Sequence, residues 1–281
     1  MSPNTVIVHL THIASAPRLL SVALEMARPA KGHVIGLVIL PPLVVLPAGT
    51  PGQADPIVID KQRQHTRDLA TAIAPVLATT LAASGCTGEV AVVDAADETP
   101  GSVLLDRAMT ADLVVVSRYP AGWSRLETSD APDSLALGCG RPVVVVPDQP
   151  ASTPFGRRVL LAWDGGREAA RALFDALPLL QSADAVHIAW IAPENDPYLA
   201  FGLQPSDVAA TLGRHGIACE ARAVQRPRGM AGRALLEAAA EFRADFLVMG
   251  CYGHSRLLEF VLGGVSRHVL EHATIPVLLS H

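Results

Sequence analysis

The amino-acid sequence contains two copies of one unit, arranged in the same order along its 281 residues. Four segments of the first half have counterparts in the second: Val6–Thr11 with Val159–Asp164, Leu81–Glu89 with Leu212–Glu220, Gly101–Tyr119 with Gly232–Tyr252, and Arg141–Pro147 with Ile275–His281. Because four matches keep the same order, they predict a tandem duplication. The junction is predicted in the Pro-, Ser- and Thr-rich segment Pro147–Arg158, which gives domains 1–148 and 157–281.

Each copy alternates short apolar runs with helical patterns. The runs of the second copy are Val159–Trp163, Val186–Ile191, Ala218–Val224, Phe246–Met249 and Pro276–Leu279. Between the first two runs, apolar side chains recur at helical spacing and predict one buried helix face: Ala169, Ala170, Leu173, Phe174 and Leu177. Apolar strands joined by helices are typical of a parallel sheet covered on both faces. We therefore predict an α/β fold with two tandem doubly wound domains, each a five-stranded parallel sheet with helices on both faces.

Charge and cysteine usage exclude several classes of function. The net charge is −5, with 22 basic and 27 acidic residues scattered along the chain, so no basic stripe for nucleic acid is present in the sequence. The four cysteines form no CxxC pair and no zinc-site spacing, so no metal site is predicted. The start of the sequence lacks a signal-peptide pattern, and its longest apolar stretch is short and contains three prolines. We expect a cytoplasmic protein that does not bind membranes.

Four glycines follow the fourth apolar run of the second copy: Gly250, Gly253, Gly263 and Gly264. In a doubly wound sheet, ligands bind outside the carboxyl ends of the strands, which is where this segment begins. Glycine lets backbone N–H groups approach an anion closely, and the N-terminus of the following helix favours phosphate. The pattern predicts a phosphate cradle. Two separate chain turns with glycine C-caps remain the alternative.

The segment Gly250–Leu270 resembles the G-x2-G-x9-G-[S/T] nucleotide loop of the universal stress proteins, with Gly250, Gly253 and Gly263 on its three glycines. "LLAWDGGREAARAL" resembles the first strand and helix start of that family, and "ATIPVLL" its closing strand. The resemblance covers essentially the whole chain as a tandem-type member. It implies a stress-response role with ATP or a related adenine nucleotide as ligand, with or without Mg²⁺. Gly264 departs from the family pattern, which has a hydroxyl there; Ser266 is the nearest candidate to replace it.

The resemblance also implies roles for individual residues. Asp164 corresponds to an acidic residue near the ribose; the alternative is an Asp favoured by the helix dipole alone. Ala162 and Trp163 would line the adenine and Ile191 would pack against the base, while a core position is the alternative for Trp163. The remaining residues of the predicted nucleotide site are Met249, Gly250, Gly253, His254, Gly263, Gly264, Val265 and Ser266. Arg256 and Arg267 would lie near the phosphates or on the solvated surface.

The first copy departs from this pattern. Pro120 stands where the second copy has Gly253, and Asp130 and Asp133 stand in the segment that would face phosphate. Because proline has no N–H and carboxylates repel phosphate, we expect this copy to have lost the site. Thr11 replaces Asp164. The Pro-rich loop Pro41–Asp60 is a candidate lid or interface. The resemblance implies that the closing strands of the two copies pair antiparallel, as a pseudo-two-fold dimer.

Catalytic motifs are not evident in the sequence, which has no GxSxG and no HExxH. We therefore expect bound ATP to act as a regulatory ligand that is hydrolysed slowly at most, with protein partners, including a second copy, that the sequence does not identify. The alternative function is a protein-interaction module of the same fold that works without nucleotide.

Overall fold

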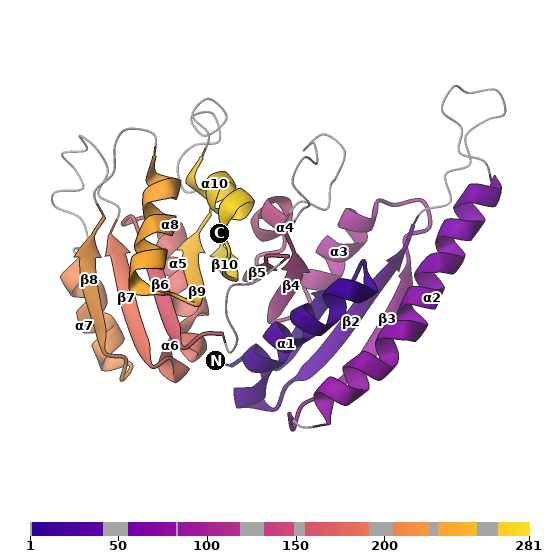
Figure 1. Cartoon of the computed structure of the whole chain (residues 1–281), viewed down its shortest axis with the longest axis horizontal. Coiled ribbons are helices and arrows are strands. Elements are labelled where there is room, and N and C mark those ends of the chain that lie inside the picture. Colours follow the sequence, from indigo (N-terminus) through magenta and orange to yellow (C-terminus); the bar gives the residue numbers. More distant parts are fainter. Residues whose placement is uncertain are drawn as a thin grey trace. The chain divides into compact units, whose positions relative to one another are not determined.

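The computed structural model describes residues 2–41, 56–82, 84–118, 132–148, 155–190, 205–224, 230–251 and 264–281. Two compact units make up the chain, and we consider each by itself (Figure 1). The N-terminal unit comprises Pro3–Ser117 and Gly122–Cys139, and the C-terminal unit comprises Gly140–His281 with Met1–Ser2 and Arg118–Ala121. Among the helices of the described ranges, none combines the length and apolar composition that a bilayer crossing requires.

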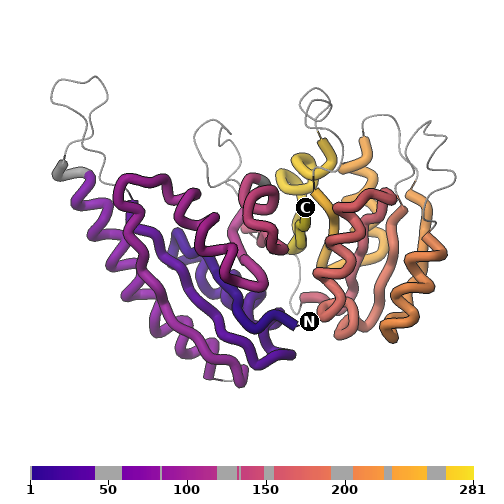
Figure 2. Tube along the Cα trace, turned by 180° about the vertical axis from the view of Figure 1, so that it is seen from behind, coloured from indigo at the N-terminus to yellow at the C-terminus, as the bar shows by residue number. Residues whose placement is uncertain are grey.

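The N-terminal unit is built on four parallel strands in the order β3-β2-β1-β4. These strands are β1 (Thr5–His9), β2 (His33–Leu40), β3 (Thr87–Asp94) and β4 (Leu113–Ser117). Its helices are α1 (Ala16–Ala27), α2 (Pro56–Leu81), α3 (Pro100–Ala108) and α4 (Pro132–Gly138), with short 3-10 turns at Ile13–Ser15 and Arg28–Ala30. Helix α1 packs against α2 and α3 against α4, and α1 and α3 lie on opposite faces of the sheet (Figures 1 and 2).

The C-terminal unit has six strands in the order β5-β10-β9-β6-β7-β8. They are β5 (Val143–Val146), β6 (Arg158–Trp163), β7 (Ala185–Trp190), β8 (Cys219–Ala223), β9 (Phe246–Gly250) and β10 (Val277–Ser280). The helices are α5 (Arg167–Asp175), α6 (Leu177–Ser182), α7 (Pro205–Arg214), α8 (Ala231–Phe242) and α10 (Val265–His272). Figure 1 shows α8 and α10 in front of the strands, and Figure 2 shows α5, α6 and α7 covering the other face. The predicted α/β fold with parallel strands and helices on both faces is confirmed.

Strand β5 comes from the first half of the sequence and packs in the C-terminal unit. It pairs antiparallel with β10, with Val144 opposite Leu278, as the sequence predicted for the closing strands. All four valines of β5 and Val277, Leu278 and Leu279 of β10 are buried. Because an unpaired apolar edge strand would expose both backbone groups and side chains, this pairing protects the β10 edge. The predicted domain boundaries, 1–148 and 157–281, remain a prediction.

The two copies repeat the same backbone framework. The Asp112 carboxylate accepts hydrogen bonds from the backbone N–H groups of Asn4 and Thr5 at the start of β1, at 2.9 and 3.0 Å. Its counterpart, the Asp245 carboxylate, accepts hydrogen bonds from the backbone N–H groups of Arg157 and Arg158 at the start of β6, at 3.1 Å each. The turns before β3 and β8 likewise each contain a glycine with positive φ, 72° at Gly85 and 77° at Gly216. These shared contacts agree with the sequence matches.

One predicted helix differs in the structure. The segment after β6 forms two helices, α5 and α6, which meet at Ala176, two residues before Pro178. The sequence prediction placed Phe174 on the buried face, and this is wrong: Phe174 is 51% exposed. Ala169 and Leu173 are buried as predicted, together with Ala172, while Ala170 and Leu177 are half-buried. The Phe174 ring meets the His215 ring edge to face, with ring centroids 6.3 Å apart.

A pair of substitutions tests the importance of the β5–β10 pairing. Val144→Asp should lower the free energy of unfolding by at least about 3 kcal/mol, since it places an unpaired carboxylate in the buried strand. Val92→Asp on β3 is the matched control because Val92 is 47% exposed, and it should change that free energy by less than about 1 kcal/mol. Chemical denaturation gives both values, and equal effects would contradict the role assigned to β5.

Candidate functional site

The carboxyl ends of β6 and β9 meet at one edge of the C-terminal sheet. The two strands are parallel neighbours, with Val159 opposite Phe246 and Leu161 opposite Val248. Asp164 is the first residue after β6, and Gly250 is the last residue of β9. The structure thus brings two predicted site residues to the same sheet edge, where parallel α/β sheets bind ligands.

Asp164 takes part in the turn that starts α5. Its Oδ1 accepts the N–H of Gly166 at 2.8 Å, and Gly165 between them has φ 84°. An Asp that bonds the backbone two residues ahead is a common turn former. This local bond is a structural role for Asp164 that needs no ligand.

Gly250 has a structural reason to be glycine. A Cβ added there would lie 2.5 Å from the backbone nitrogen of Ala169 and closer still to the carbonyl carbon of Glu168. The first turn of α5 therefore packs directly on the end of β9, and any larger residue would push the helix away. Close approach of the backbone thus explains this glycine whether or not a phosphate is bound.

Gly264, a predicted site residue, is the N-cap of helix α10. Its carbonyl accepts the N–H of His268 at 3.1 Å, which forms the first turn. Because φ is −54° and ψ 153° at Gly264, a serine or threonine could adopt the same backbone there. Gly264 offers no side chain to cap the first turn of α10, and the N-terminal amides of a helix suit an anion. Ser266, in this turn, is 2% exposed.

Among the other predicted site residues, Val265 is half-buried in the first turn of α10, and the rest are either buried or outside the described residues. Ala162, Trp163 and Met249 are buried at the ends of their strands. The 3% exposure of Trp163 agrees with its core alternative, and its indole Nε1 has no hydrogen-bond partner among the described residues. The remaining residues of the predicted site lie outside the described residues: Ile191, Gly253, His254, Gly263 and the nearby Arg256. Residues 42–55 of the Pro-rich loop do so too.

Sequence reasoning missed Glu168, which is 5% exposed beside Gly250 and forms an ion pair with Arg167. Burial raises the pKa of the Glu168 carboxyl, but the bond from Arg167 and the positive charge at His281 outweigh it, so that this pKa lies below its usual value. A lone Glu in a helix start carries no sequence signal for burial. The Glu168 carboxylate adds negative charge close to the end of β9.

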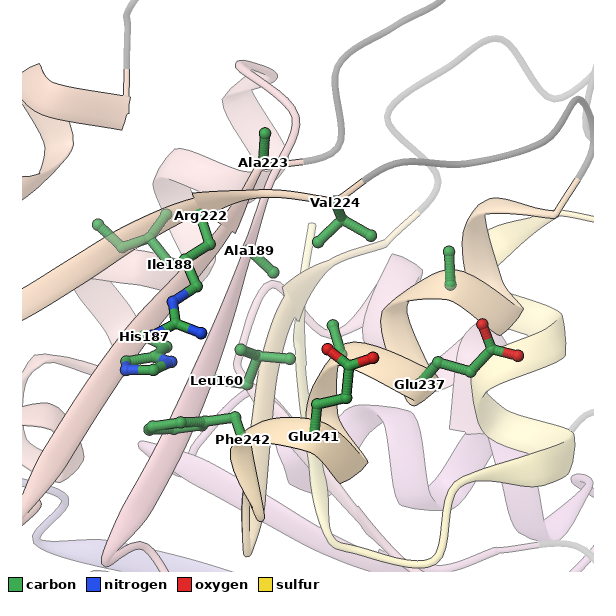
Figure 3. Close-up of a pocket in the computed structure, with 12 residues that line it drawn as sticks. Leu160, His187, Ile188, Ala189, Arg222, Ala223, Val224, Glu237, Glu241 and Phe242 are labelled. Atoms are coloured by element: carbon green, nitrogen blue, oxygen red, sulfur yellow. The ribbon is translucent and has the colours of Figure 1, made fainter.

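A cavity of about 260 Å³ lies on the α8 face of the C-terminal sheet (Figure 3). Apolar residues of β6, β7, β8 and α8 form its floor, and the charged residues on its walls are His187, Arg222, Glu237 and Glu241. Of the predicted nucleotide residues that the structure describes, none lines it. Because two of the wall residues are carboxylates, this cavity does not suit a phosphate chain.

The N-terminal unit has different contacts at its strand ends. Ser117, the counterpart of Gly250, accepts a hydrogen bond from Arg18 Nη2 at 2.6 Å. Pro41, the first residue after β2, has its carbonyl oxygen bonded by the buried Arg63 at 2.6 Å, and Arg63 also forms an ion pair with Asp94. Arginine side chains therefore bond the residues at the carboxyl ends of β4 and β2.

Comparison with known proteins relates the chain to one family. Residues 156–281 match the model of the Universal stress protein family, which places one domain of this kind in the second half. The chain is 30% identical over 140 residues to Universal stress protein Slr1230 of Synechocystis sp., a match that covers 49% of this chain and 46% of the relative. The aligned part thus spans about half the length of that relative.

Solved structures resemble the whole chain in fold. A universal stress protein from Archaeoglobus fulgidus matches with a TM-score of 0.75 and 17% identity, over 100% of this chain and 96% of the other. The functionally unknown protein PA1789 from Pseudomonas aeruginosa matches with a TM-score of 0.57 and 15% identity, over 99% and 92% of the two chains. At these identities the likeness establishes the fold alone.

The contact of Gly250 with α5 generates a prediction about stability without ligand. Gly250→Ala should lower the free energy of unfolding by about 2 kcal/mol or more, because the new Cβ clashes with backbone atoms. Gly213→Ala in α7 is the control: a Cβ there meets no atom within 4 Å, and helix propensity should raise stability by about 0.5–1 kcal/mol. Thermal unfolding of the ligand-free proteins compares the two. If Gly250→Ala leaves the free energy of unfolding unchanged, packing against α5 does not explain this glycine, and close approach of a ligand to the backbone is the remaining explanation.

His9 is the last residue of β1 and corresponds to Ala162 of β6. It generates a prediction about how stability depends on pH. Burial lowers the pKa of its imidazole to about 4. Because the folded pKa is below the unfolded value, the stability due to neutral His9 is fully present above about pH 6.5 and is lost as the pH falls toward 4. NMR titration should find His9 neutral at pH 5.5. In His9→Gln, the loss of stability between pH 6.5 and 4 should be smaller; an unchanged pH profile would contradict the assignment.

Proposed function

We propose that the chain is a stress-response regulatory protein of tandem type that binds ATP or a related adenine nucleotide in its second domain. The observation that carries this proposal is the glycine-spaced segment between β9 and α10, which starts and ends at the sheet edge where Asp164 lies. The match of residues 156–281 to the Universal stress protein family supports it. In this proposal, the Asp164 carboxylate accepts hydrogen bonds from the ribose hydroxyls. The backbone at Gly253 and Gly263 and the first turn of α10 bind the phosphates.

We further propose one nucleotide per chain. Pro120 removes a backbone donor from the first copy, and Asp130 and Asp133 add negative charge. Two carboxylates close to a phosphate at an effective dielectric near 20 cost several kcal/mol, roughly two or more orders of magnitude in affinity. The contacts of Arg18 with Ser117 and of Arg63 with Pro41 also support a first copy closed to nucleotide.

The second candidate is a protein-interaction module that works without nucleotide. Specific observations favour it: Gly250 and Asp164 both have structural roles in positioning α5, so their presence does not require a ligand. Mass spectrometry of small molecules released from the purified, denatured protein separates the two candidates. Adenine nucleotide at close to one equivalent supports the first, and its absence together with no binding of added ATP supports the second.

The proposed cradle generates a prediction about affinity. Gly253→Val and Gly263→Val should each weaken ATP binding at least about 100-fold, because a branched side chain blocks close approach of the backbone to phosphate. Folding should survive, which circular dichroism checks, and Gly213→Ala is the binding control. Calorimetric titration of the parent should give one site per chain. ATP binding at parental strength by both variants, or two equivalent sites in the parent, would contradict the proposal.

A further inference from the structure

Helix α10 depends on neighbouring elements for its position. It has 8 residues, and a helix of that length is marginal without tertiary contacts. Val269 lies on the inner face of α10 and is fully buried. Gly232 of α8 lies against His268, where an added Cβ would come within 2.8 Å of the His268 Cβ. These two contacts fix the middle of α10 and leave its C-terminal end to be held by another group.

Arg118 holds that end. Its Nη1 donates to the carbonyl oxygens of Glu271 at 3.2 Å and Ala273 at 3.0 Å. These carbonyls belong to the end of the helix, where no intrahelical N–H is available to them and where a positive charge is favourable. A third carbonyl, that of His268, is bonded by the Nδ1 of His272 at 2.9 Å. The guanidinium thus completes the C-terminal cap of α10.

The cap comes from the first copy, immediately after β4. The backbone N–H of Arg118 bonds the Val146 carbonyl at 2.9 Å, and its counterpart Cys251 bonds the Ser280 carbonyl at the same distance. The two positions therefore have the same backbone setting and different side chains. Cys251 has neither the length nor the charge to cap a helix in this way, so this use of the position is particular to the first copy.

We propose that Arg118 is a positioning residue for nucleotide binding: by capping the C-terminus of α10 it holds the N-terminal amides of that helix at the sheet edge, in line with the phosphates. This inference rests on the proposed function. Arg118, the second residue of the first-copy segment that aligns with the nucleotide loop, would thereby serve the site of the second copy. The effect concerns phosphate and not the adenosine part, because α10 would contact only the phosphates.

The test compares ATP with adenosine in calorimetric titrations of the full chain. In Arg118→Ala, the dissociation constant for ATP should rise about tenfold, the scale of a lost cap and two lost hydrogen bonds, while that for adenosine should change less than about twofold. Arg118→Lys retains a cation and donors, and it should bind ATP within about threefold of the parent. Arg28→Ala is the matched control, because Arg28, just after α1, forms an exposed ion pair with Glu25 of α1 at 3.1 Å; neither affinity should change.

Hydrogen exchange provides an independent readout, since loss of the cap should speed exchange of the α10 amides in Arg118→Ala and not in Arg28→Ala. Equal weakening of ATP and adenosine, or ATP binding at parental strength in Arg118→Ala, would overturn the inference and leave the proposed function intact. A parent protein that binds neither ligand would overturn the proposed function and this inference with it. Faster α10 exchange would then identify Arg118 as a structural cap alone.

Discussion

The antiparallel pairing of β5 with β10 is the contact on which the C-terminal unit depends. Strand β10 is fully buried, so its outer edge needs a partner, and the chain supplies one from its first half. With that edge covered, β10 can support β9, and β9 in turn ends at the candidate site. The candidate site of the second copy is thus built on a strand that belongs, in sequence, to the first.

The candidate site rests on close approaches between backbones and not on a cluster of reactive side chains. Gly250 lets the first turn of α5 pack on β9, and Gly232 lets α8 pack on α10. Each contact sets the position of a helix whose N-terminus faces the sheet edge. Amides and dipoles suit the binding of an anionic ligand better than bond-breaking chemistry, which fits a regulatory role for the proposed nucleotide.

The two copies show how one framework can serve two purposes. Asp112 and Asp245 hold the strand starts in the same way, and Gly85 and Gly216 make the same turn. The copies differ at the carboxyl ends of the strands, where the first has Arg18, Arg63 and Arg118 bonded to protein groups. In the proposed function, the first copy has lost the ligand and keeps contacts, such as the cap by Arg118, that support the second.

The sequence by itself determined the succession of strands and helices, because periodic burial and internal repetition are local patterns. The antiparallel pairing of the two closing strands was implied only by the resemblance to the universal stress proteins, and the structure has that pairing between β5 and β10. It also identified Asp164, Gly250 and Gly264 as residues of one sheet edge. Only the tertiary structure decided that Gly250 accommodates α5, that Phe174 faces outward, that Glu168 is buried and that Arg118 caps α10. These features depend on which backbone lies against which, and contacts between distant segments leave no periodic pattern in the sequence.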